Sequence, residues 1–367
     1  MKIKVNRSDI LPSLNLVSSV VEKRQTLPIL ANLFFSVEAG VLKMVGTDLE
    51  VEITESVNKV AGDDGVFTVS SRKIQDIVRM LPENADISLK LDKENVVVTS
   101  GRSRYTLKTL PADDFPRIEI GNWEERFKID QSVLKRLLDK TAFAMAVQDV
   151  RYYLNGVLFE LSQNNLRAIA TDGHRLAQSD VDIDLSINDT RQLIVPRKAI
   201  AEINRFVGGD DDSEVTVEIN KNHLKLSKGD TVLITKLIDG KFPEFKGVLE
   251  TTMETTVSLD RTTFIDTMNR AAVLTTDRFR GVKLTLEDNT LRITANNPEQ
   301  EEAVEEMEIN HEGGKIETGY NVGYLIDAAK VAGGESIDLH LQGNDGISII
   351  RQNDDPRSVW LIMPMRI

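Results

Sequence analysis

The chain carries one pattern three times, and this repetition is the feature that most limits the folds open to it. The segment 42–48, Leu-Lys-Met-Val-Gly-Thr-Asp, has counterparts at 166–172 and 291–297. Each copy follows a strand-like segment and a short polar turn, with apolar and polar residues alternating along both arms. That alternation predicts a β-hairpin. A hairpin that recurs at a regular interval predicts repeated domains rather than one large core.

The residues around each hairpin repeat as well. A short strand leads through Asn6, Asp130 or Asp260 into an amphipathic helix, and these side chains suit a helix N-cap. A second strand and helix follow, with helices expected at about 72–81, 197–207 and 321–331. We therefore predict an α+β fold of three similar domains, 1–122, 123–250 and 251–367, each a doubled strand–helix–strands unit in two layers.

Composition narrows the classes of function. The chain has no cysteine, which excludes disulfides and thiolate metal sites. The N-terminus lacks the apolar run of a signal peptide, and no stretch reaches the roughly 18 apolar residues of a membrane span. We therefore expect a soluble, cytoplasmic protein. The net charge of −13 opposes nucleic-acid binding at face value, because duplex affinity depends on neutralised phosphates.

The distribution of charge points the other way. The six expected helices carry more Lys and Arg than Asp and Glu, although the whole chain holds 45 basic and 58 acidic residues. A bias shared by six helices predicts a common electropositive surface that attracts phosphates without reading bases. For any single helix the alternative is that lysine and arginine are simply good helix formers on a solvated face.

Domain size constrains the assembly. A domain of about 120 residues is roughly 35 Å across, so three in a closed ring leave a hole of about 5 Å and six leave about 35 Å. A duplex roughly 20 Å wide passes only through the larger hole. Two chains joined head to tail would be needed, and such a joint must close by symmetry.

Two oppositely charged surfaces are candidates for that joint. One is the basic stretch 101–107 on a late strand of the first repeat, and the other is an acidic run in the third repeat beside an apolar helix end. An ordinary solvated face is the equally weighted alternative for the acidic run. The candidate residues are Arg102 and Arg104 on the first surface, and Glu299, Glu301, Glu302, Val273 and Leu274 on the second.

Several motifs resemble those of the bacterial DNA polymerase III β-subunit family, the DNA sliding clamps, and the resemblance covers the whole chain. The motifs are Thr26–Leu30, Gly46–Glu50, Arg151–Gly156, Ala170–Leu176, Asn296–Glu301 and Met363–Arg366. The resemblance implies a head-to-tail homodimeric ring of six domains, with helices inside and sheets outside. It implies a processivity factor without catalytic activity or cofactor, loaded onto duplex DNA by an ATP-driven clamp loader. The replicative polymerase α subunit, other polymerases and repair proteins would dock short peptides in a pocket between the second and third domains.

The resemblance also implies the residues of each site. The peptide pocket would comprise Leu154, Thr171, Gly173, His174, Arg175, Leu176, Pro243, Val248, Asn321, Tyr324, Leu361, Met363, Pro364, Met365 and Arg366. DNA would contact Arg24, Arg72, Gln148, Tyr152 and Tyr153, with Arg197 and Lys198 as helix-borne candidates. Tyr105 and Leu107 would face Val273 and Leu274 at the dimer joint. Core packing is the alternative for the two adjacent tyrosines. Gly247 departs from the family, which has a basic residue at that pocket rim; here Lys246 stands beside it.

Two other functions stay open. An enzyme would use Asp172 and His174 as an acid–base pair, or as metal ligands with Asp48, but the third repeat has Asn297 where Asp172 stands. The remaining histidines show no ligand spacing, so we predict no catalytic or metal site. There is no phosphate-binding loop, and Gly208–Asp212 is expected to be a solvated turn rather than a calcium site. A protein-interaction scaffold without a DNA role is disfavoured by the basic helices.

Overall fold

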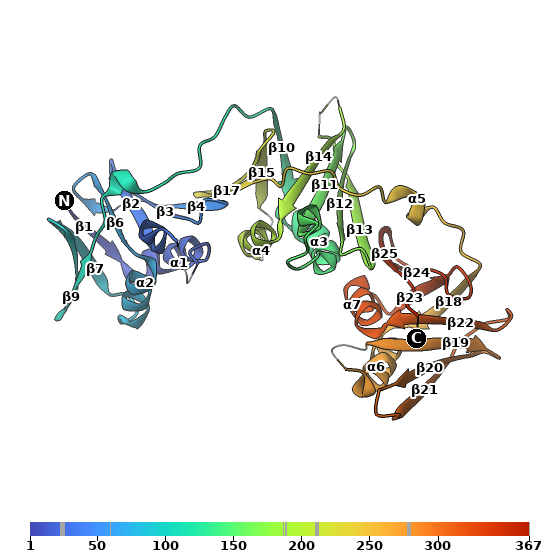
Figure 1. Cartoon of the computed structure of the whole chain (residues 1–367). Coiled ribbons are helices and arrows are strands. Elements are labelled where there is room, and N and C mark those ends of the chain that lie inside the picture. The colour runs from blue at the N-terminus through green and yellow to red at the C-terminus, as the bar shows by residue number, and fades with distance from the viewer. Residues whose placement is uncertain are drawn as a thin grey trace. The chain divides into compact units, whose positions relative to one another are not determined.

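The computed structural model describes residues 1–22, 26–58, 60–185, 187, 189–209, 213–276 and 280–366. The chain forms two compact units, Met1–Leu134 with Lys198–Leu237, and Lys135–Arg197 with Ile238–Ile367, and each is described by itself. Apart from the additional short strand β5 (Ala61–Gly62) in the first repeat, helices and strands follow one order in all three repeats (Figure 1). None of the described helices is long and apolar enough to cross a membrane.

Each repeat contains two helices, each of which follows directly on a strand. The first repeat has β1 (Lys2–Asn6), α1 (Arg7–Ser18), β2 (Asn32–Glu38), β3 (Val41–Thr47), β4 (Val51–Val57), β5 (Ala61–Gly62), β6 (Gly65–Ser70), α2 (Ser71–Met80), β7 (Asp86–Asp92), β8 (Asn95–Ser100) and β9 (Ser103–Lys108). The second has β10 (Glu125–Asp130), α3 (Gln131–Thr141), β11 (Gly156–Ser162), β12 (Asn165–Thr171), β13 (Arg175–Asp182), β14 (Arg191–Pro196), α4 (Arg197–Phe206), β15 (Glu214–Ile219), β16 (His223–Lys228) and β17 (Thr231–Lys236). The third has β18 (Thr255–Asp260), α6 (Arg261–Ala271), β19 (Gly281–Glu287), β20 (Thr290–Asn296), β21 (Glu302–Glu308), β22 (Ile316–Asn321), α7 (Val322–Ala332), β23 (Ser336–Leu341), β24 (Ser348–Gln352) and β25 (Asp355–Ile362). The short helix α5 (Lys246–Leu249) lies in the segment before the third repeat.

Side-chain caps begin several of these helices. Asn6 Oδ1 accepts the Ser8 N–H at 3.0 Å, and Asp260 Oδ1 accepts the Thr263 N–H at 2.7 Å. Each bond satisfies a backbone donor that has no partner inside the helix. Asn321 caps α7 in the same way, through the Gly323 N–H at 2.9 Å, so α7 begins at Val322 rather than at Asn321.

The first unit contains a sheet that joins two repeats. Its strand order is β10-β15-β16-β17-β4-β3-β2-β6, in which four strands come from each repeat. The antiparallel pair β17 and β4 forms the join, with Leu233 opposite Ile53. A second sheet, β5-β1-β7-β8-β9, ends in the edge strand β9. In Figure 1, α1 and α2 lie side by side next to these strands.

The second unit repeats this arrangement. Its larger sheet has the order β14-β11-β12-β13-β25-β24-β23-β18, and β13 pairs with β25 so that Ala177 is opposite Trp360. Its smaller sheet, β21-β20-β19-β22, ends in the edge strand β21. By position, β4, β13 and β21 are equivalent strands, as are β17, β25 and β9. The predicted α+β fold of three similar, internally doubled repeats is confirmed.

The join in the first unit contains a buried carboxylate at Glu52. This side chain stands opposite Ile234 and is 2% exposed. Arg117 Nε and Nη2 donate to its two oxygens at 3.0 and 2.8 Å, and the Ile118 N–H donates at 3.1 Å. These three bonds fasten the segment after the first repeat across the join. The equivalent position in the second unit is Leu176, which is apolar.

A second carboxylate, Glu55, stands at the same join, near the charges of Asp230 and Lys228. It is opposite Thr231, and its Oε2 is buried with no hydrogen-bond partner among the described residues. Burial raises the pKa of Glu55 above its ordinary value, and a hydrogen bond from the Thr231 side chain opposes that rise. The charged form of this side chain is therefore disfavoured in the folded state.

We expect Glu55→Gln to raise the free energy of unfolding at pH 7, because an amide is not charged when buried. The folded-state pKa of Glu55 exceeds the unfolded value, so its contribution to stability is present below the ordinary pKa of 4.5 and is lost as pH rises through the folded-state pKa. The advantage of glutamine should shrink as the pH falls toward that value. Urea unfolding across this range measures it, with Glu50→Gln on an exposed turn as the control. A pH-independent advantage would contradict the assignment.

Candidate functional site

A tight turn after β12 positions four of the predicted pocket residues. Thr171 Oγ1 donates to the Arg175 carbonyl at 2.6 Å and accepts the Gly173 N–H at 3.0 Å. Asp172 Oδ1 accepts the N–H groups of His174 and Arg175 at 2.9 and 3.0 Å. Gly173 has a φ of +88°, in the left-handed region that glycine enters without a steric penalty. The Asp172 carboxylate therefore organises the backbone of the turn.

The first repeat builds the same turn from other side chains. Thr47 Oγ1 donates to the Val51 carbonyl at 3.0 Å, and Asp48 Oδ1 accepts the N–H groups of Glu50 and Val51 at 2.8 and 2.7 Å. Leu49 replaces the glycine with a φ of +76°. Because the turn forms without glycine or histidine, it is a structural unit of the repeat. This argues against an acid–base pair at Asp172 and His174.

Arg175 ties this turn to the third repeat within the second unit. Its guanidinium donates to Asp172 at 3.1 Å, to Asp327 at 2.7 Å and to the Phe143 carbonyl at 2.9 Å. It also lies 4.4 Å from the ring centroid of Tyr324 and 5.1 Å from that of Phe143. Burial, followed by the Asp172 charge, raises the pKa of Tyr324. The arginine is thus largely occupied by the protein itself, and it forms a wall of the site.

An apolar cluster lies beside the turn. It contains the predicted residues Leu154, Leu176 and Leu361 together with Phe242 and Phe245, whose rings are 6.4 Å apart. The other members are Ala146, Leu158, Ile169, Ile194, Ile347, Ile349 and Val359, with Tyr153, Ile238, Leu249 and Met253 packed against them. The sequence interpretation did not include the two phenylalanines, which lie close to the predicted boundary between the second and third domains. Their Phe-Pro-Glu-Phe spacing, with Pro243 and Glu244 exposed between buried rings, is the signal that identifies them.

The C-terminal tail runs beside this cluster. The Met363 N–H donates to the His174 carbonyl and the Met365 N–H to the Gly319 carbonyl, both at 2.9 Å. Met363 is 40% exposed, so part of its thioether side chain is available to a ligand. Val248 is 39% exposed and lies between Phe245 and Leu249. Exposed apolar side chains thus border a buried apolar cluster. Of the remaining predicted residues, Pro364 is half-buried, Arg366 is exposed, and Asn321 caps α7.

Two basic residues at this site are held by nearby carboxylates. Arg151, which the sequence interpretation did not include, donates to both oxygens of Asp149 at 3.0 and 2.8 Å and to the Asp172 carbonyl at 3.2 Å. Its guanidinium lowers the pKa of Asp149 to about 2. Lys246 Nζ lies 3.6 Å from Glu160. A side chain added at Gly247 would meet open space, so steric crowding does not require glycine at this position.

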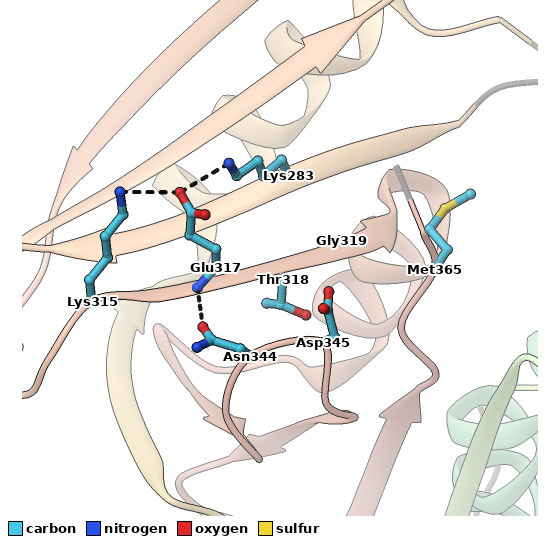
Figure 2. Close-up of a pocket in the computed structure, with 8 residues that line it drawn as sticks. All are labelled: Lys283, Lys315, Glu317, Thr318, Gly319, Asn344, Asp345 and Met365. Carbon is cyan, nitrogen blue, oxygen red and sulfur yellow. Dashed lines mark hydrogen bonds and ion pairs between the residues drawn. The ribbon is translucent and has the colours of Figure 1, made fainter.

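A separate pocket of about 470 Å³ lies along β22. Figure 2 shows Lys283 and Lys315 reaching Glu317 from two sides, and the ion pairs measure 3.0 and 3.2 Å. Asn344 Oδ1 accepts the Glu317 N–H at 2.7 Å. Met365 of the tail also lines this pocket, but the remaining lining residues, Thr318, Gly319 and Asp345, are not among the predicted ones. Lys283 and Lys315 pair with Glu317, so these charges are largely compensated within the pocket itself.

The predicted DNA-contact residues differ in how free their side chains are. Arg72 on α2 has a 92% exposed side chain, and Tyr152 is 57% exposed. Gln148 is exposed in a loop with a φ of +53°. Tyr153 packs against the apolar cluster, which is the alternative given for one of the two tyrosines. Arg24 lies outside the described residues.

The two helix-borne candidates are engaged by their own unit. Arg197 Nη1 donates to the carbonyls of Met145 and Ala146 at 3.2 and 3.4 Å. Lys198 bonds to Glu22 at 2.6 Å and to Asp48. Burial alone would lower the pKa of Lys198, but its hydrogen bonds to Asp48 and Glu22 raise it above the ordinary value. Lys198 would have to exchange partners to contact a phosphate, whereas the two bonds of Arg197 use only Nη1.

The candidate dimer residues lie at two edge strands. Arg102 precedes β9, which carries Arg104, Tyr105 and Leu107, and Tyr105 is 38% exposed. β21 carries Glu302, with Glu299 and Glu301 just before it. Val273 lies in the short helical turn that follows α6, and it is 78% exposed. Leu274 ends that turn. Among the described residues, no cluster of three metal-ligating side chains occurs. Asp210, Asp211 and Asp212 lie outside the described residues.

Comparison with known proteins gives matches along the whole chain. Family models of the DNA polymerase III beta subunit match residues 1–119 (N-terminal domain), 128–244 (central domain) and 246–366 (C-terminal domain). The Beta sliding clamp of Pseudomonas aeruginosa is 42% identical, with all of both chains covered. The crystal structure of a Pseudomonas aeruginosa DNA polymerase sliding clamp with ligand superposes with a TM-score of 0.97, at 42% identity and full coverage of both chains. A DnaN sliding clamp from the same organism, bound to griselimycin, has a TM-score of 0.96 at the same identity and coverage.

We expect Arg175→Ala to lower the free energy of unfolding by about 3 kcal/mol, because it leaves the Asp172 carboxylate, which is only 16% exposed, and the Phe143 carbonyl without their partner. Arg175→Lys should recover only part of this, since lysine cannot make the forked bonds or stack between two rings. Denaturant unfolding followed by Trp360, which is buried in the same unit, measures the loss. Equal stability of the alanine and parent proteins would show that Arg175 is not a structural tie.

Proposed function

Because the chain belongs to the DNA polymerase III beta subunit family, we propose that it is a DNA sliding clamp that encircles duplex DNA without reading its sequence. The observation that carries this proposal is the match of three family domains over the chain, together with the structural likeness to solved clamps along its full length. The proposed role is non-catalytic: the ring tethers a polymerase and so gives it processivity. It acts in the cytoplasm and is placed on DNA by an ATP-driven clamp loader.

The equivalence of edge strands supports a head-to-tail homodimer. Inside the chain, β17 pairs with β4 and β25 pairs with β13. The same two strand positions are left unpaired at the edges of the remaining sheets, as β9 and β21. Pairing β9 of one copy with β21 of another repeats the internal join, and two such joints close a ring. The proposal thus extends one type of contact to all six joints.

The internal joins also give the register of the proposed joint. Tyr105 is equivalent to Leu233 and Trp360, and Ala303 to Ile53 and Ala177, so Tyr105 stands opposite Ala303. Leu107 is the buried residue of β9, and the odd-numbered residues of β21 are less exposed than the even-numbered ones, so Arg104 and Glu302 lie on the same, outer face in this register. Arg104 lies diagonally across from Glu302, within reach of long side chains. This is the predicted attraction between the basic and acidic surfaces.

The exposed basic and aromatic side chains support the DNA role. Arg72 and Tyr152 present exposed side chains, although Arg72 Nε lies 3.8 Å from Asp76 and the Tyr152 ring lies edge-on to Tyr153. Arginine contacts to phosphates provide affinity without sequence specificity, and an exposed tyrosine supports it by stacking or hydrogen bonding. The proposed partners are therefore duplex DNA and, through the tail and cluster, short peptides from the replicative polymerase α subunit, other polymerases and repair proteins.

The tail and the cluster have the chemistry of a peptide site. Leu176 and Leu361 provide an apolar floor, and Met363 is an adaptable side chain at its border. Partner side chains such as leucine or phenylalanine fit such a slot. Since Lys246 is paired with Glu160, the rim lacks a free cation at this point. We therefore propose that recognition here is mainly apolar.

We expect the protein, once loaded on circular DNA by a clamp loader and ATP, to stay bound through gel filtration at high salt. It should be lost when the circle is cut, because a ring is held by topology rather than by contacts. The measurement is the fraction of labelled protein that elutes with DNA before and after cutting. Retention that does not depend on cutting would refute the encircling ring and favour a scaffold.

We expect deletion of Met363–Ile367 to weaken binding of a clamp-docking peptide from a bacterial polymerase α subunit by about a hundredfold, since it removes a central anchor. Fluorescence anisotropy measures the affinity, and sedimentation checks that assembly is unchanged. Lys283→Ala, in the pocket of Figure 2, is the matched control and should leave the affinity as it was. Parent-like affinity in the truncated protein would refute the site.

A further inference from the structure

The two joins inside the chain each place a helix residue and a strand residue at equivalent positions. In the second unit these are Lys140 of α3 and Trp360 of β25. Lys140 Nζ lies 5.3 Å from the centroid of the Trp360 ring, and the Trp360 Nε1–H donates to the Lys140 carbonyl at 2.9 Å. In the first unit the same positions hold Leu16 and Leu233, and Leu233 is completely buried. One join thus has a cation–aromatic pair where the other has two leucines.

The third set of equivalent positions is divided between the two ends of the chain. Each first helix begins directly after its strand, so Arg270 of α6 corresponds to Lys140 and Leu16. The strand register makes Tyr105 of β9 the counterpart of Trp360 and Leu233. Arg270 has a 56% exposed side chain, and Tyr105 is 38% exposed. Arg270 and Tyr105 are therefore more exposed to solvent than the residues at the equivalent positions of the two internal joins.

Arg270 is already held at the edge where a second strand would pair. Its Nε donates to Glu305 of β21 at 2.8 Å, and its Nη2 donates to Thr267 Oγ1 at 3.1 Å. Glu305 points to the same face of β21 as Ala303. In the register of the proposed joint, Tyr105 stands opposite Ala303 and diagonally across from Glu305, a distance that an aromatic ring can span. The guanidinium still has donors and one open face.

A second equivalence supports this register. In the internal joins Glu55 stands opposite Thr231, and Ser179 Oγ lies 2.9 Å from Ser358 Oγ. The corresponding residues at the chain's ends are Glu305 and Ser103, again an acceptor and a hydroxyl. In the first unit, the helix position equivalent to Arg270 is Leu16, and burial raises the pKa of Glu55. Glu305, in contrast, forms an ion pair with Arg270. The joint between copies would therefore carry a fully paired polar group.

We propose that the Arg270 guanidinium of one copy stacks on the Tyr105 ring of a second copy while it holds Glu305, which accepts a hydrogen bond from Ser103 of that second copy. This inference rests on the proposed clamp assembly and assigns Arg270, on a helix outside the paired strands, to the joint. The cation–aromatic contact replaces water on both exposed side chains. It gives the subunit joint the same chemistry as the Lys140–Trp360 pair.

A double-mutant cycle tests the pair. Tyr105→Leu and Arg270→Met keep apolar bulk but remove the ring or the charge, and each should raise the dimer dissociation constant about tenfold. The double variant should lose less affinity than the product of the two single effects, because the contact between the ring and the guanidinium is lost in all three. Fluorescence-detected sedimentation of labelled protein measures the constants. Arg261→Met, on the first turn of the same helix, should leave the constant unchanged. Effects that multiply in the double variant would overturn the pairing.

A separate cross-link checks the assembly itself. The chain has no cysteine, so Thr106→Cys with Glu302→Cys, which are opposite each other in the proposed register, should give a covalent dimer on mild oxidation. Thr106→Cys with Val304→Cys, displaced by one step along the same face, should cross-link much more slowly. Failure of the first pair would refute the head-to-tail joint and with it the clamp assembly. A cross-linked dimer with additive effects in the cycle would overturn only the contact between Arg270 and Tyr105.

Discussion

Antiparallel pairing between strands of successive repeats is the interaction on which the rest of the structure depends. Each large sheet holds four strands from one repeat and four from the next, and in the described part of the chain the β-ladder between the two sets is β17 with β4 or β25 with β13. That ladder buries Ile53 and Leu233 in one unit and Ala177 and Trp360 in the other. A shift of one residue would turn these side chains outward, so burial fixes the register strongly.

The same ladder creates the candidate peptide site. It places Leu176 of β13 next to Leu361 of β25, so the apolar floor is made by two repeats together. The tail continues directly from β25 and is therefore held beside the Thr171–Arg175 turn by main-chain bonds. Arg175 fixes the turn against α7 through Asp327 and Tyr324. The candidate site and the join share residues, so a substitution in either one is expected to disturb the other.

Much of this organisation could be predicted from the sequence, because it is encoded by local patterns. The repeated hairpins, the N-caps at Asn6 and Asp260 and the Thr-Asp turn depend on neighbouring residues only. The remainder depends on long-range contacts that no local pattern encodes. Lys198 and Arg197 carry the charge expected of DNA contacts, yet within the fold Lys198 donates to two carboxylates and Arg197 Nη1 donates to two carbonyls. Phe242 and Phe245 lie between repeats in the sequence and belong to the core in space.

The buried Glu52 has a consequence for how many partners one ring can serve. At the first join, Arg117 and Ile118 donate hydrogen bonds to this carboxylate. Glu52 stands at the position that Leu176 has at the second join. An apolar peptide side chain at that position would face an ion pair, so the proposed peptide site occurs once in each chain rather than twice. The proposed ring of two copies would then offer two such sites, for which polymerases and repair proteins with a docking peptide would compete. Which partner is on the DNA becomes a matter of relative concentration and affinity, and exchange requires one of them to leave.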